Sequence, residues 1–315
     1  MAFINSIQLA SCHSFYNSTT RSRLYPYAQH RCDQRAVTST RAARRAIRLI
    51  ASDIDGTLLT SAKRLHPRNE PSVRRAVSSG VLFVPATGKS MSGAQRALGH
   101  SLTTYLEKKQ PGLPGIYLNG LLVRVHGRTI FEQTLEKEHV LKVLEEAGRR
   151  RLTPLLYAAD NILVTRRSKH TDMFMVSFEP EPQAVNLRAT VEKESIHKVL
   201  LVDETGGDVR RYRDEMTHAL HSVATITQAR PDVLEVLPNG ANKGLALQHL
   251  LKHLRISNEN AMAVGDGEND MEMLQTAGVA VATANAVPSL RRVAHHVVCA
   301  NDEGAVADAI YRFVL

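Results

Sequence analysis

Short apolar runs alternate with amphipathic stretches along the chain from residue 46 to the C-terminus. Runs such as residues 81–86 and 261–264 carry no charged side chain. Strands of a parallel sheet are covered on both faces, so they appear in a sequence as continuous apolar runs rather than as alternating ones. Helical stretches between such runs place helices on both faces of the sheet. The pattern therefore predicts an α/β fold built on a doubly wound parallel sheet.

The first part of the sheet is expected from five successive elements. Three strands are predicted from apolar runs, at residues 46–50, 81–86 and 115–118. Pro67 and Gly80 mark the start and the end of a helix after the first strand. A second helix is expected at residues 92–98. This alternation of strands and helices is typical of a doubly wound sheet.

The pattern changes after Gly120 to short strands joined by turns and mixed with helices. A hairpin is expected around His126-Gly127, and further strands and helices follow it, at residues 136–150, 154–157, 161–164, 197–203, 208–221, 224–228 and 233–236. Such mixed elements predict an α+β module inserted into the sheet domain. The alternation of strands and helices that is expected for the sheet domain then resumes, at residues 243–254, 261–264, 271–277, 279–282, 287–294, 297–298 and 303–313.

The chain is expected to have four parts, which are an N-terminal extension, the first part of the sheet domain, the inserted module and the second part of the sheet domain, at residues 1–46, 47–121, 122–228 and 229–315. The extension is rich in Arg, Ser and Thr, which is typical of an organellar transit peptide. Its hydroxyl-rich start favours a plastid, although its arginines would also suit a mitochondrion. The alternative is a disordered extension without a targeting role, which would leave the protein in the cytoplasm.

Charge and composition exclude several classes of protein. The extension holds seven arginines, no lysine and one acid, a net charge of +6, which leaves +3 of the total of +9 for the rest. Aromatic residues make up 5% of the chain and none is Trp, so a surface that stacks nucleic-acid bases is not expected. No apolar stretch approaches the roughly 18 residues that a membrane span needs. The three cysteines, Cys12, Cys32 and Cys299, fit neither a disulfide framework nor a zinc site.

Two aspartate clusters follow apolar strands that lie more than 200 residues apart. They are Asp53-Ile54-Asp55-Gly56-Thr57 and Gly265-Asp266-Gly267-Glu268-Asn269-Asp270. Carboxylates beyond the carboxyl ends of parallel strands lie where open α/β sheets build their active sites, so the clusters can converge. Because so many carboxylates stay ionised together only beside a cation, and oxygen ligands select Mg²⁺, the clusters predict a magnesium site.

The two carboxylates of the first cluster suit different steps of phosphoryl transfer. Asp53, at the end of its strand, could attack phosphorus and form an aspartyl-phosphate, which divides one difficult displacement into two easier steps. Asp55 could protonate the leaving oxygen and later take a proton from water. Donors for the phosphate oxygens are expected at other strand ends and helix starts, namely at Thr87, Gly88, Lys243 and Asn269.

Each motif taken alone has another interpretation. The Asp-x-Asp-Gly-Thr string also suits a surface loop or a calcium-binding turn, and a lysine at a helix start, such as Lys243, is usually exposed. Gly265-x-Gly267 resembles part of a dinucleotide-binding loop, but its third glycine is missing and Asp270 would repel a pyrophosphate. The joint occurrence of the motifs in this order favours phosphoryl transfer.

The order of the motifs resembles the haloacid dehalogenase superfamily, and the inserted module resembles the C2-type cap of its Cof-like branch. The similarity extends to further strings, which are Tyr117-Leu118-Asn119-Gly120, Lys243-Gly244-x-Ala246-Leu247, Val281-Ala282-x-x-x-Asn285-Ala286 and Asn301-Asp302-Glu303-Gly304-x-Val306. It covers nearly all of residues 47–315. The resemblance implies a Rossmann-like core with an α/β cap at residues 122–228, and a Mg²⁺-dependent phosphatase that acts through an aspartyl-phosphate.

The resemblance also implies a role for each residue of the site. Asp53 would be the nucleophile and a metal ligand, and Asp55 would be the acid and base, with its backbone carbonyl on Mg²⁺. Asp266 would be the third ligand, while Asp270 would either bind the metal directly or orient Lys243. The phosphate would be held by four residues, which are Thr87, Gly88, Lys243 and Asn269.

Alternatives within and outside the superfamily stay open, namely a phosphomutase, another phosphotransferase or a non-catalytic relative that senses a ligand. Asp55 favours hydrolysis over a transporter-type ATPase, because its carboxylate can serve as the base that speeds hydrolysis. The expected substrate is a sugar phosphate or a nucleotide- or flavin-like monophosphate, with Mg²⁺ as cofactor and with neither nucleic acid nor membrane as partner. The chain is expected to be a monomer or a homodimer. Lys89 stands where this branch usually has arginine, so a bidentate substrate contact is not expected there.

Overall fold

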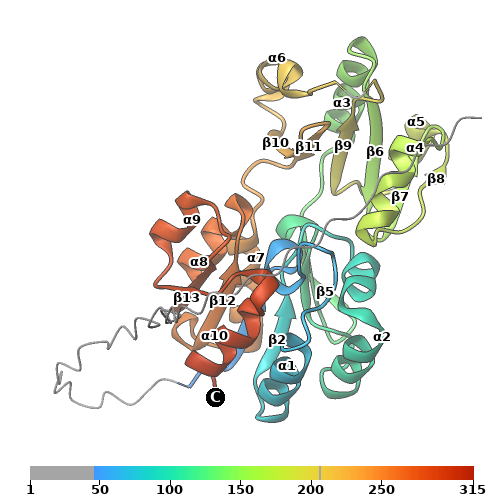
Figure 1. Cartoon of the computed structure of the whole chain (residues 1–315). Helices are drawn as coiled ribbons and strands as arrows, with labels where there is room; N and C mark the ends of the chain where they lie inside the picture. Colours follow the sequence, from blue (N-terminus) through green and yellow to red (C-terminus); the bar gives the residue numbers. More distant parts are fainter. Residues whose placement is uncertain (1–45, 206) are drawn as a thin grey trace, which may run out of the picture. The chain divides into compact units, whose positions relative to one another are not determined.

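The computed structural model describes residues 46–205 and 207–315 of the chain. The predicted targeting segment therefore lies outside the described residues, apart from Ala46. Within the described residues the chain forms three sheets, of five, three and six strands, with helices around them (Figure 1).

The five-stranded sheet is parallel throughout, as the sequence predicts. Its strands, in spatial order, are β14 (His296–Val298), β13 (Val279–Thr283), β12 (Ala261–Gly265), β1 (Leu49–Ser52) and β2 (Leu82–Pro85). The chain passes from β1 to β2 on one side and from β12 to β13 and β14 on the other. The order of strands therefore reverses between β1 and β12, which is where open α/β sheets bind their ligands.

Helices cover both faces of this sheet, so its strands are apolar on both sides. One face packs on α1 (Asn69–Ser78), α2 (Met91–Lys109) and α10 (Ala305–Phe313), with Ile50, Phe83 and Met262 between them. The other face packs on α7 (Lys243–Leu254), α8 (Met271–Thr276) and α9 (Pro288–Val293), with Leu49, Val84 and Ala263 between them. Successive residues of a strand point to opposite faces, and here both sets of side chains are buried.

Helix α2 is longer than the sequence predicts, because the expected helix at residues 92–98 continues to Lys109. Gly99 interrupts it with a φ of +77°, a conformation that favours glycine, and the helix then resumes. Leu102 and Leu106 beyond the interruption are fully buried against the sheet. This burial depends on the tertiary structure, and it stabilises the helix beyond residue 98, where the local sequence pattern predicts that the helix ends.

The predicted hairpin around His126-Gly127 forms β4 (Leu122–Val125) and β5 (Arg128–Glu132), and β4 also pairs with β3 (Gly115–Tyr117). All pairs in this small sheet are antiparallel. A parallel bridge between Ala86 and Ile116 joins it to the end of β2. The hairpin therefore continues from the edge of the five-stranded sheet.

The six-stranded sheet is the centre of the predicted α+β module. Its strands, in spatial order, are β10 (Thr225–Arg230), β11 (Val233–Leu237), β9 (Lys198–Val202), β6 (Thr153–Ala158), β7 (Asn161–Val164) and β8 (Gln183–Ala184). The helices of this module are α3 (Lys137–Arg149), α4 (Lys169–Asp172), α5 (Leu187–Val191) and α6 (Arg210–Leu220). Strand β11 lies beyond residue 228, and the limits of the module at residues 122 and 228 stay a prediction.

The two faces of the six-stranded sheet have different neighbours. On one face Leu156, Val199 and Leu234 pack with apolar side chains of α3, α5 and α6. On the other face Leu155, Leu200 and Val233 pack with side chains from the first part of the chain, which are Ile54, Leu59, Ala94, Ala97, Tyr117, Leu118, Leu121 and Leu122. Ile54 stands between the two aspartates of the first cluster, so this face of the sheet covers the turn that carries them.

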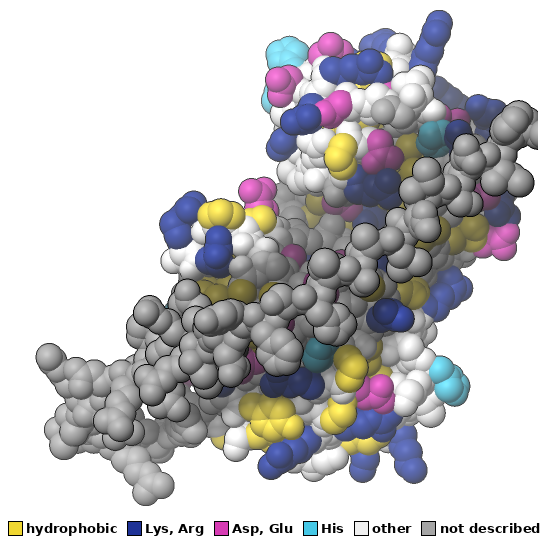
Figure 2. Space-filling view, in the orientation of Figure 1, with side chains coloured by type: hydrophobic (Ala, Val, Ile, Leu, Met, Phe, Trp, Pro, Cys, Tyr) yellow, Lys and Arg dark blue, Asp and Glu magenta, His cyan; other side chains and the backbone are white. Residues whose placement is uncertain are grey.

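The described surface has a mixed charge. In the space-filling view, Lys and Arg side chains stand among Asp and Glu side chains on the visible face (Figure 2). None of the helices formed by residues 46–205 and 207–315 combines the length and the apolar character that a membrane crossing needs.

We expect Leu49→Ala to lower the free energy of unfolding by about 2–5 kcal/mol, because it opens a cavity at the fully buried first residue of β1. Arg48→Ala changes the neighbouring residue, whose side chain is exposed, and should cost less than about 0.5 kcal/mol. Urea unfolding followed by circular dichroism measures both. Equal stabilities of the two variants would show that Leu49 is not packed as described.

Candidate active site

Asp53 lies directly after β1, and its position is set by the neighbouring strand. Its backbone N–H donates to the carbonyl of Val264 in β12 at 2.9 Å, which continues the parallel pairing by one residue. The chain then leaves the sheet in a tight turn, Ile54–Leu58, in which Gly56 has a φ of +76°. Asn285 donates to the carbonyl of Gly56 at 2.8 Å and holds this turn.

The turn is built around Asp266 at the end of β12. A Cβ atom on Gly56 would lie 2.2 Å from Asp266 Oδ2, so only glycine fits at this position. The hydroxyl of Thr57 donates to Asp266 Oδ1 at 2.8 Å. The two aspartate clusters, distant in the sequence, are therefore joined in space by a side-chain hydrogen bond.

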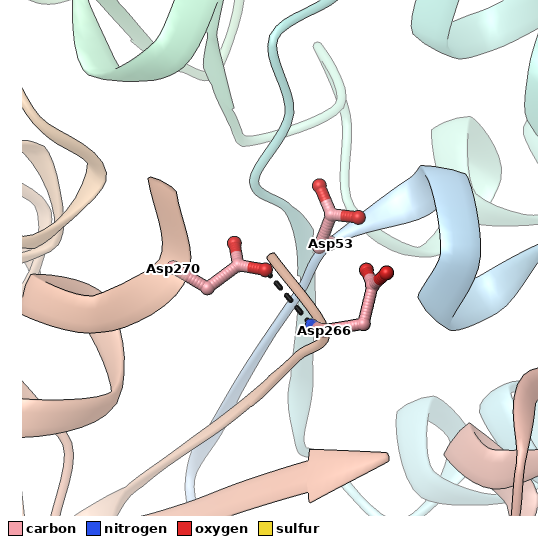
Figure 3. Close-up of side chains that lie close together, drawn as sticks. All are labelled: Asp53, Asp266 and Asp270. Carbon is pink, nitrogen blue, oxygen red and sulfur yellow. Dashed lines mark hydrogen bonds between the residues drawn. The ribbon is translucent and has the colours of Figure 1, made fainter. Parts of the chain in front are cut away.

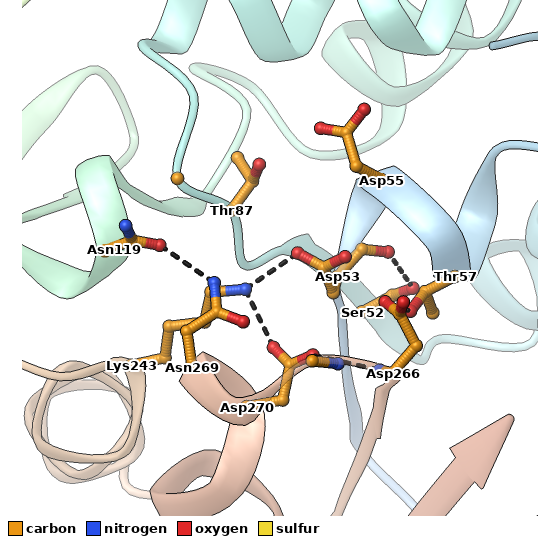
Figure 4. A network of polar contacts seen from close by, with 12 residues as sticks. Ser52, Asp53, Asp55, Thr57, Thr87, Asn119, Lys243, Asp266, Asn269 and Asp270 are labelled. Carbon is orange, nitrogen blue, oxygen red and sulfur yellow. Dashed lines mark hydrogen bonds and ion pairs between the residues drawn. The ribbon is translucent and has the colours of Figure 1, made fainter. Parts of the chain in front are cut away.

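Lys243 is the buried cation of the site. It is the first residue of α7, its side chain has no exposed surface, and its Nζ donates to Asp53 Oδ1 and to Asp270 Oδ1, each at 2.7 Å. Figure 4 shows these two bonds. Burial lowers the pKa of Lys243, but Asp270 and Asp53 raise it more strongly, so the pKa lies above its ordinary value and the ammonium stays charged.

Asp270 uses both of its carboxylate oxygens within the protein. Oδ1 accepts from Lys243, while Oδ2 accepts from the backbone N–H groups of Asp266 and Gly267 at 3.0 Å each. Figure 3 shows the bond to Asp266. The sequence left open whether Asp270 binds the metal or orients Lys243. These contacts favour the orienting role, and we propose it.

Three carboxylates lie close enough to share a cation. One oxygen each from Asp53, Asp266 and Asp270 lies within 4.8 Å of the others. Burial raises the pKa of Asp53 well above its ordinary value, against the effect of Lys243, and the other two aspartates add to the rise. Burial, together with Asp270, also raises the pKa of Asp266 to about 6. More negative charge is gathered here than Lys243 neutralises, and an oxygen-only donor set fits a hard divalent cation such as Mg²⁺.

Asp55 stands apart from these three carboxylates (Figure 4). It pairs with two lysines, Lys63 and Lys89. Its Oδ1 lies 2.8 Å from Lys63 Nζ and its Oδ2 lies 2.6 Å from Lys89 Nζ. Burial alone would raise the pKa of Asp55, but Lys89 and Lys63 together hold it below its ordinary value. Lys89, for which the sequence predicted no bidentate substrate contact, therefore has a partner in Asp55.

The four phosphate donors predicted from the sequence come from three loops. Thr87 follows β2 and is buried, and its Oγ1 accepts from the backbone N–H of Lys89 at 3.2 Å. A Cβ atom on Gly88 would lie 2.9 Å from Asn119 Oδ1. The same oxygen accepts from Asn269 Nδ2 at 3.1 Å. Asn119 thus links the loop of Gly88 to the loop of Asn269.

Four further residues at this site were missed as site residues, namely Asn119, Lys63, and the pair of Lys198 and Glu235 on the six-stranded sheet. Asn119 ends an apolar strand, which is the same signal that identified Asp53 and Thr87. Lys198 and Glu235 bond to each other at 2.7 Å, and they contact Gly88 and Asn119. Both lie within predicted strands, where a charged residue gives no sign of what it contacts.

Comparisons with known proteins identify the family of the chain. Residues 50–310 match the model of a family described as haloacid dehalogenase-like hydrolase. The chain is 32% identical over 268 residues to Endoribonuclease YBEY, chloroplastic, of Arabidopsis thaliana. The match covers 84% of this chain but 46% of that protein. The chain thus spans about half the length of that relative. It is also 28% identical over 284 residues to the Bacillus subtilis 5-amino-6-(5-phospho-D-ribitylamino)uracil phosphatase YcsE, covering 85% and 96% of the two chains.

A solved structure gives the same result for the fold. A haloacid dehalogenase-like hydrolase from Bacteroides thetaiotaomicron superposes with a TM-score of 0.76 at 27% sequence identity. The match covers 84% of this chain and 99% of that one. A core with a parallel sheet and additional sheets is therefore common to both proteins.

We expect Gly56→Ala to weaken Mg²⁺ binding by about 10- to 100-fold, the usual effect of disturbing the neighbours of a metal ligand, because the new methyl group displaces Asp266. Isothermal titration calorimetry measures the affinity. Gly80→Ala is the control, since Gly80 also has a positive φ, of +90°, but nothing lies within 4 Å of its added Cβ. Equal affinities in the two variants would mean that backbone strain, and not Asp266, causes any loss.

Proposed function

This chain belongs to the haloacid dehalogenase-like hydrolase family and is a phosphatase, and we propose that it hydrolyses a small phosphorylated metabolite with Mg²⁺ through an aspartyl-phosphate. The observation that carries this proposal is the setting of Asp53. Its carboxylate lies at a strand end beside a buried ammonium group and within 4.8 Å of two further carboxylates. A carboxylate in such a setting suits nucleophilic attack on a phosphate that a cation holds in place.

In the first step an oxygen of Asp53 forms a bond to phosphorus while the bond from phosphorus to the leaving oxygen breaks. Asp55 gives its proton to that oxygen. The ion pairs of Asp55 with Lys63 and Lys89 favour its charged form. Asp55 therefore acts as an acid only when the bound substrate draws these ammonium groups away.

In the second step water attacks the phosphorus of the aspartyl-phosphate, and the bond between phosphorus and Asp53 breaks. Asp55, now a carboxylate, takes the proton of that water. Its lowered pKa fits poorly with the first step, whereas the second step needs the charged form of Asp55 that this pKa favours. The cycle returns Asp53 to its free form and releases inorganic phosphate.

The metal would be held by the carboxylates of Asp53 and Asp266 and by the backbone carbonyl of Asp55. When bound, Mg²⁺ would supply positive charge that keeps the carboxylates ionised and shields the incoming phosphate from Asp53. Four residues would hold the phosphate oxygens, which are Thr87, Gly88, Lys243 and Asn269. Lys243 contacts Asp53 directly, so its charge lies where negative charge develops during transfer.

The proposed substrate is a sugar phosphate or a nucleotide- or flavin-like monophosphate. One relative supports this class by its name, because 5-amino-6-(5-phospho-D-ribitylamino)uracil phosphatase acts on a phosphorylated sugar alcohol attached to a base. We further propose that the protein works in a plastid, in line with the relative that is named chloroplastic. Release of inorganic phosphate from a panel of phosphorylated metabolites, with and without Mg²⁺, tests the class. No turnover of any monophosphate would contradict it.

We expect Asp53→Asn to lower kcat/KM by at least about a thousandfold, because an amide cannot form the aspartyl-phosphate. Asp214→Asn makes the same chemical change at an exposed position of α6 and should leave the rate unchanged. Phosphate release in the presence of Mg²⁺ measures both variants. Activity that survives in Asp53→Asn would rule out this nucleophile.

A further inference from the structure

A buried ion pair stands on the six-stranded sheet, away from the carboxylates described above. Lys198 of β9 and Glu235 of β11 are 4% and 5% exposed, and Lys198 Nζ lies 2.7 Å from Glu235 Oε1. Taking two charges out of water costs several kcal/mol per ion, and their attraction repays this only with further hydrogen bonds. A buried pair is therefore weak evidence for stability, and its remaining contacts indicate what it does.

The pair lies on the face of the sheet that packs against the catalytic part of the chain. Strand neighbours on this face, such as Leu200, Val202 and Val233, belong to the apolar cluster that contains Ile54 of the catalytic turn. Residues of β9 alternate between the two faces, so Lys198 shares the face of Leu200 and Val202. Glu235 likewise lies two residues from Val233 on β11. Lys198 and Glu235 are thus two charged side chains on an otherwise apolar part of this face of the sheet.

Lys198 fixes the loop that carries Thr87 and Gly88. Its Nζ donates to the carbonyl of Gly88 at 2.9 Å and lies 4.7 Å from the centre of the Tyr157 ring. That carbonyl belongs to the same peptide as the N–H of Lys89, which donates to Thr87 Oγ1 at 3.2 Å. Holding the peptide therefore decides the direction of the Thr87 hydroxyl.

Glu235 acts in the same way on Asn119 and, through it, on Asn269. Its Oε2 accepts from Asn119 Nδ2 at 3.0 Å, which leaves Asn119 Oδ1 facing the other way. That oxygen accepts from Asn269 Nδ2 at 3.1 Å. Because a carboxylate accepts hydrogen bonds only, Glu235 fixes which end of the Asn119 amide faces Asn269.

We propose that Lys198 and Glu235 are positioning residues for phosphate binding. The ion pair on the six-stranded sheet sets the geometry of Thr87, through Gly88, and of Asn269, through Asn119. The sheet thereby does more than cover the site, since its own charges prepare two neutral phosphate donors. This inference rests on the proposed function, because it takes Thr87 and Asn269 to be phosphate donors.

A second contact between the same parts of the chain serves as a matched control. His197, the residue before Lys198, lies 3.0 Å from Glu132 of β5. This contact also joins the six-stranded sheet to the first part of the chain, but Glu132 contacts none of the phosphate donors in the described structure. Glu132→Gln therefore weakens the docking of the sheet without changing the loops of Thr87 and Asn269.

The test compares the full chain with Lys198→Met, Glu235→Gln, the double variant and Glu132→Gln. Binding of inorganic phosphate in the presence of Mg²⁺, measured by calorimetry, reports the phosphate site without turnover. The value of kcat/KM for a substrate found in the panel is measured beside it. A single variant that leaves one charge buried and unpaired can fail to fold. The double variant avoids this and keeps the test valid.

We expect the double variant to bind phosphate about tenfold more weakly than the unmodified chain, since small displacements of positioning groups have effects of this order or larger. The phosphate affinity of Glu132→Gln should stay within about twofold of the unmodified chain. The double variant should lose no more than the weaker-binding single variant, because the two residues act as one unit. Equal effects in the double variant and in Glu132→Gln would overturn the inference, and so would unchanged phosphate binding. Failure to hydrolyse any phosphate ester would overturn the proposed function, while phosphate binding would still decide the inference.

Discussion

The site depends on one buried ammonium group, that of Lys243, held between Asp53 and Asp270. A charge without any exposed surface is strongly destabilising unless it is paired and hydrogen-bonded, and here two carboxylates at 2.7 Å pair it. The three residues come from the end of β1, the start of α7 and the loop after β12. The ends of these elements must therefore meet, and the parallel pairing of β1 with β12 makes them meet.

One ammonium group does not neutralise the carboxylates around it. The raised pKa values of Asp53 and Asp266 follow from burial and from the repulsion of neighbouring carboxylates, Asp270 first among them, which a divalent cation would relieve. Asp270 contributes to this repulsion but has its own partners, because Lys243 and two backbone N–H groups bond to its two oxygens. Asp55 differs from these carboxylates, because Lys63 and Lys89 pair with it and hold its pKa below its ordinary value. Carboxylates of the same chemical type thus have different partners, and the pKa values of Asp53 and Asp55 shift in opposite directions.

The six-stranded sheet is coupled to this site by two kinds of contact. Apolar side chains on one of its faces pack with Ile54, which begins the turn after Asp53, and with Leu118, which precedes Asn119. Polar contacts of Lys198 and Glu235 then reach the neighbouring loops. Apolar packing brings the sheet close without specifying direction, whereas hydrogen bonds fix the orientation of single groups. Together they connect the six-stranded sheet to the loops of Thr87 and Asn269.

The sequence by itself determined the parallel sheet, most of its helices and the convergence of the two aspartate clusters. Apolar runs are local signals, and residues that follow parallel strands meet at the carboxyl edge of the sheet. It also indicated Thr87, Gly88, Lys243 and Asn269 as neighbours of that site. It predicted the end of α2 too early, since only burial of Leu102 and Leu106 extends the helix beyond Gly99. Only the tertiary structure decided which carboxylate pairs with which lysine and that Lys198 and Glu235 contact Gly88 and Asn119, because these contacts join residues that no local pattern connects.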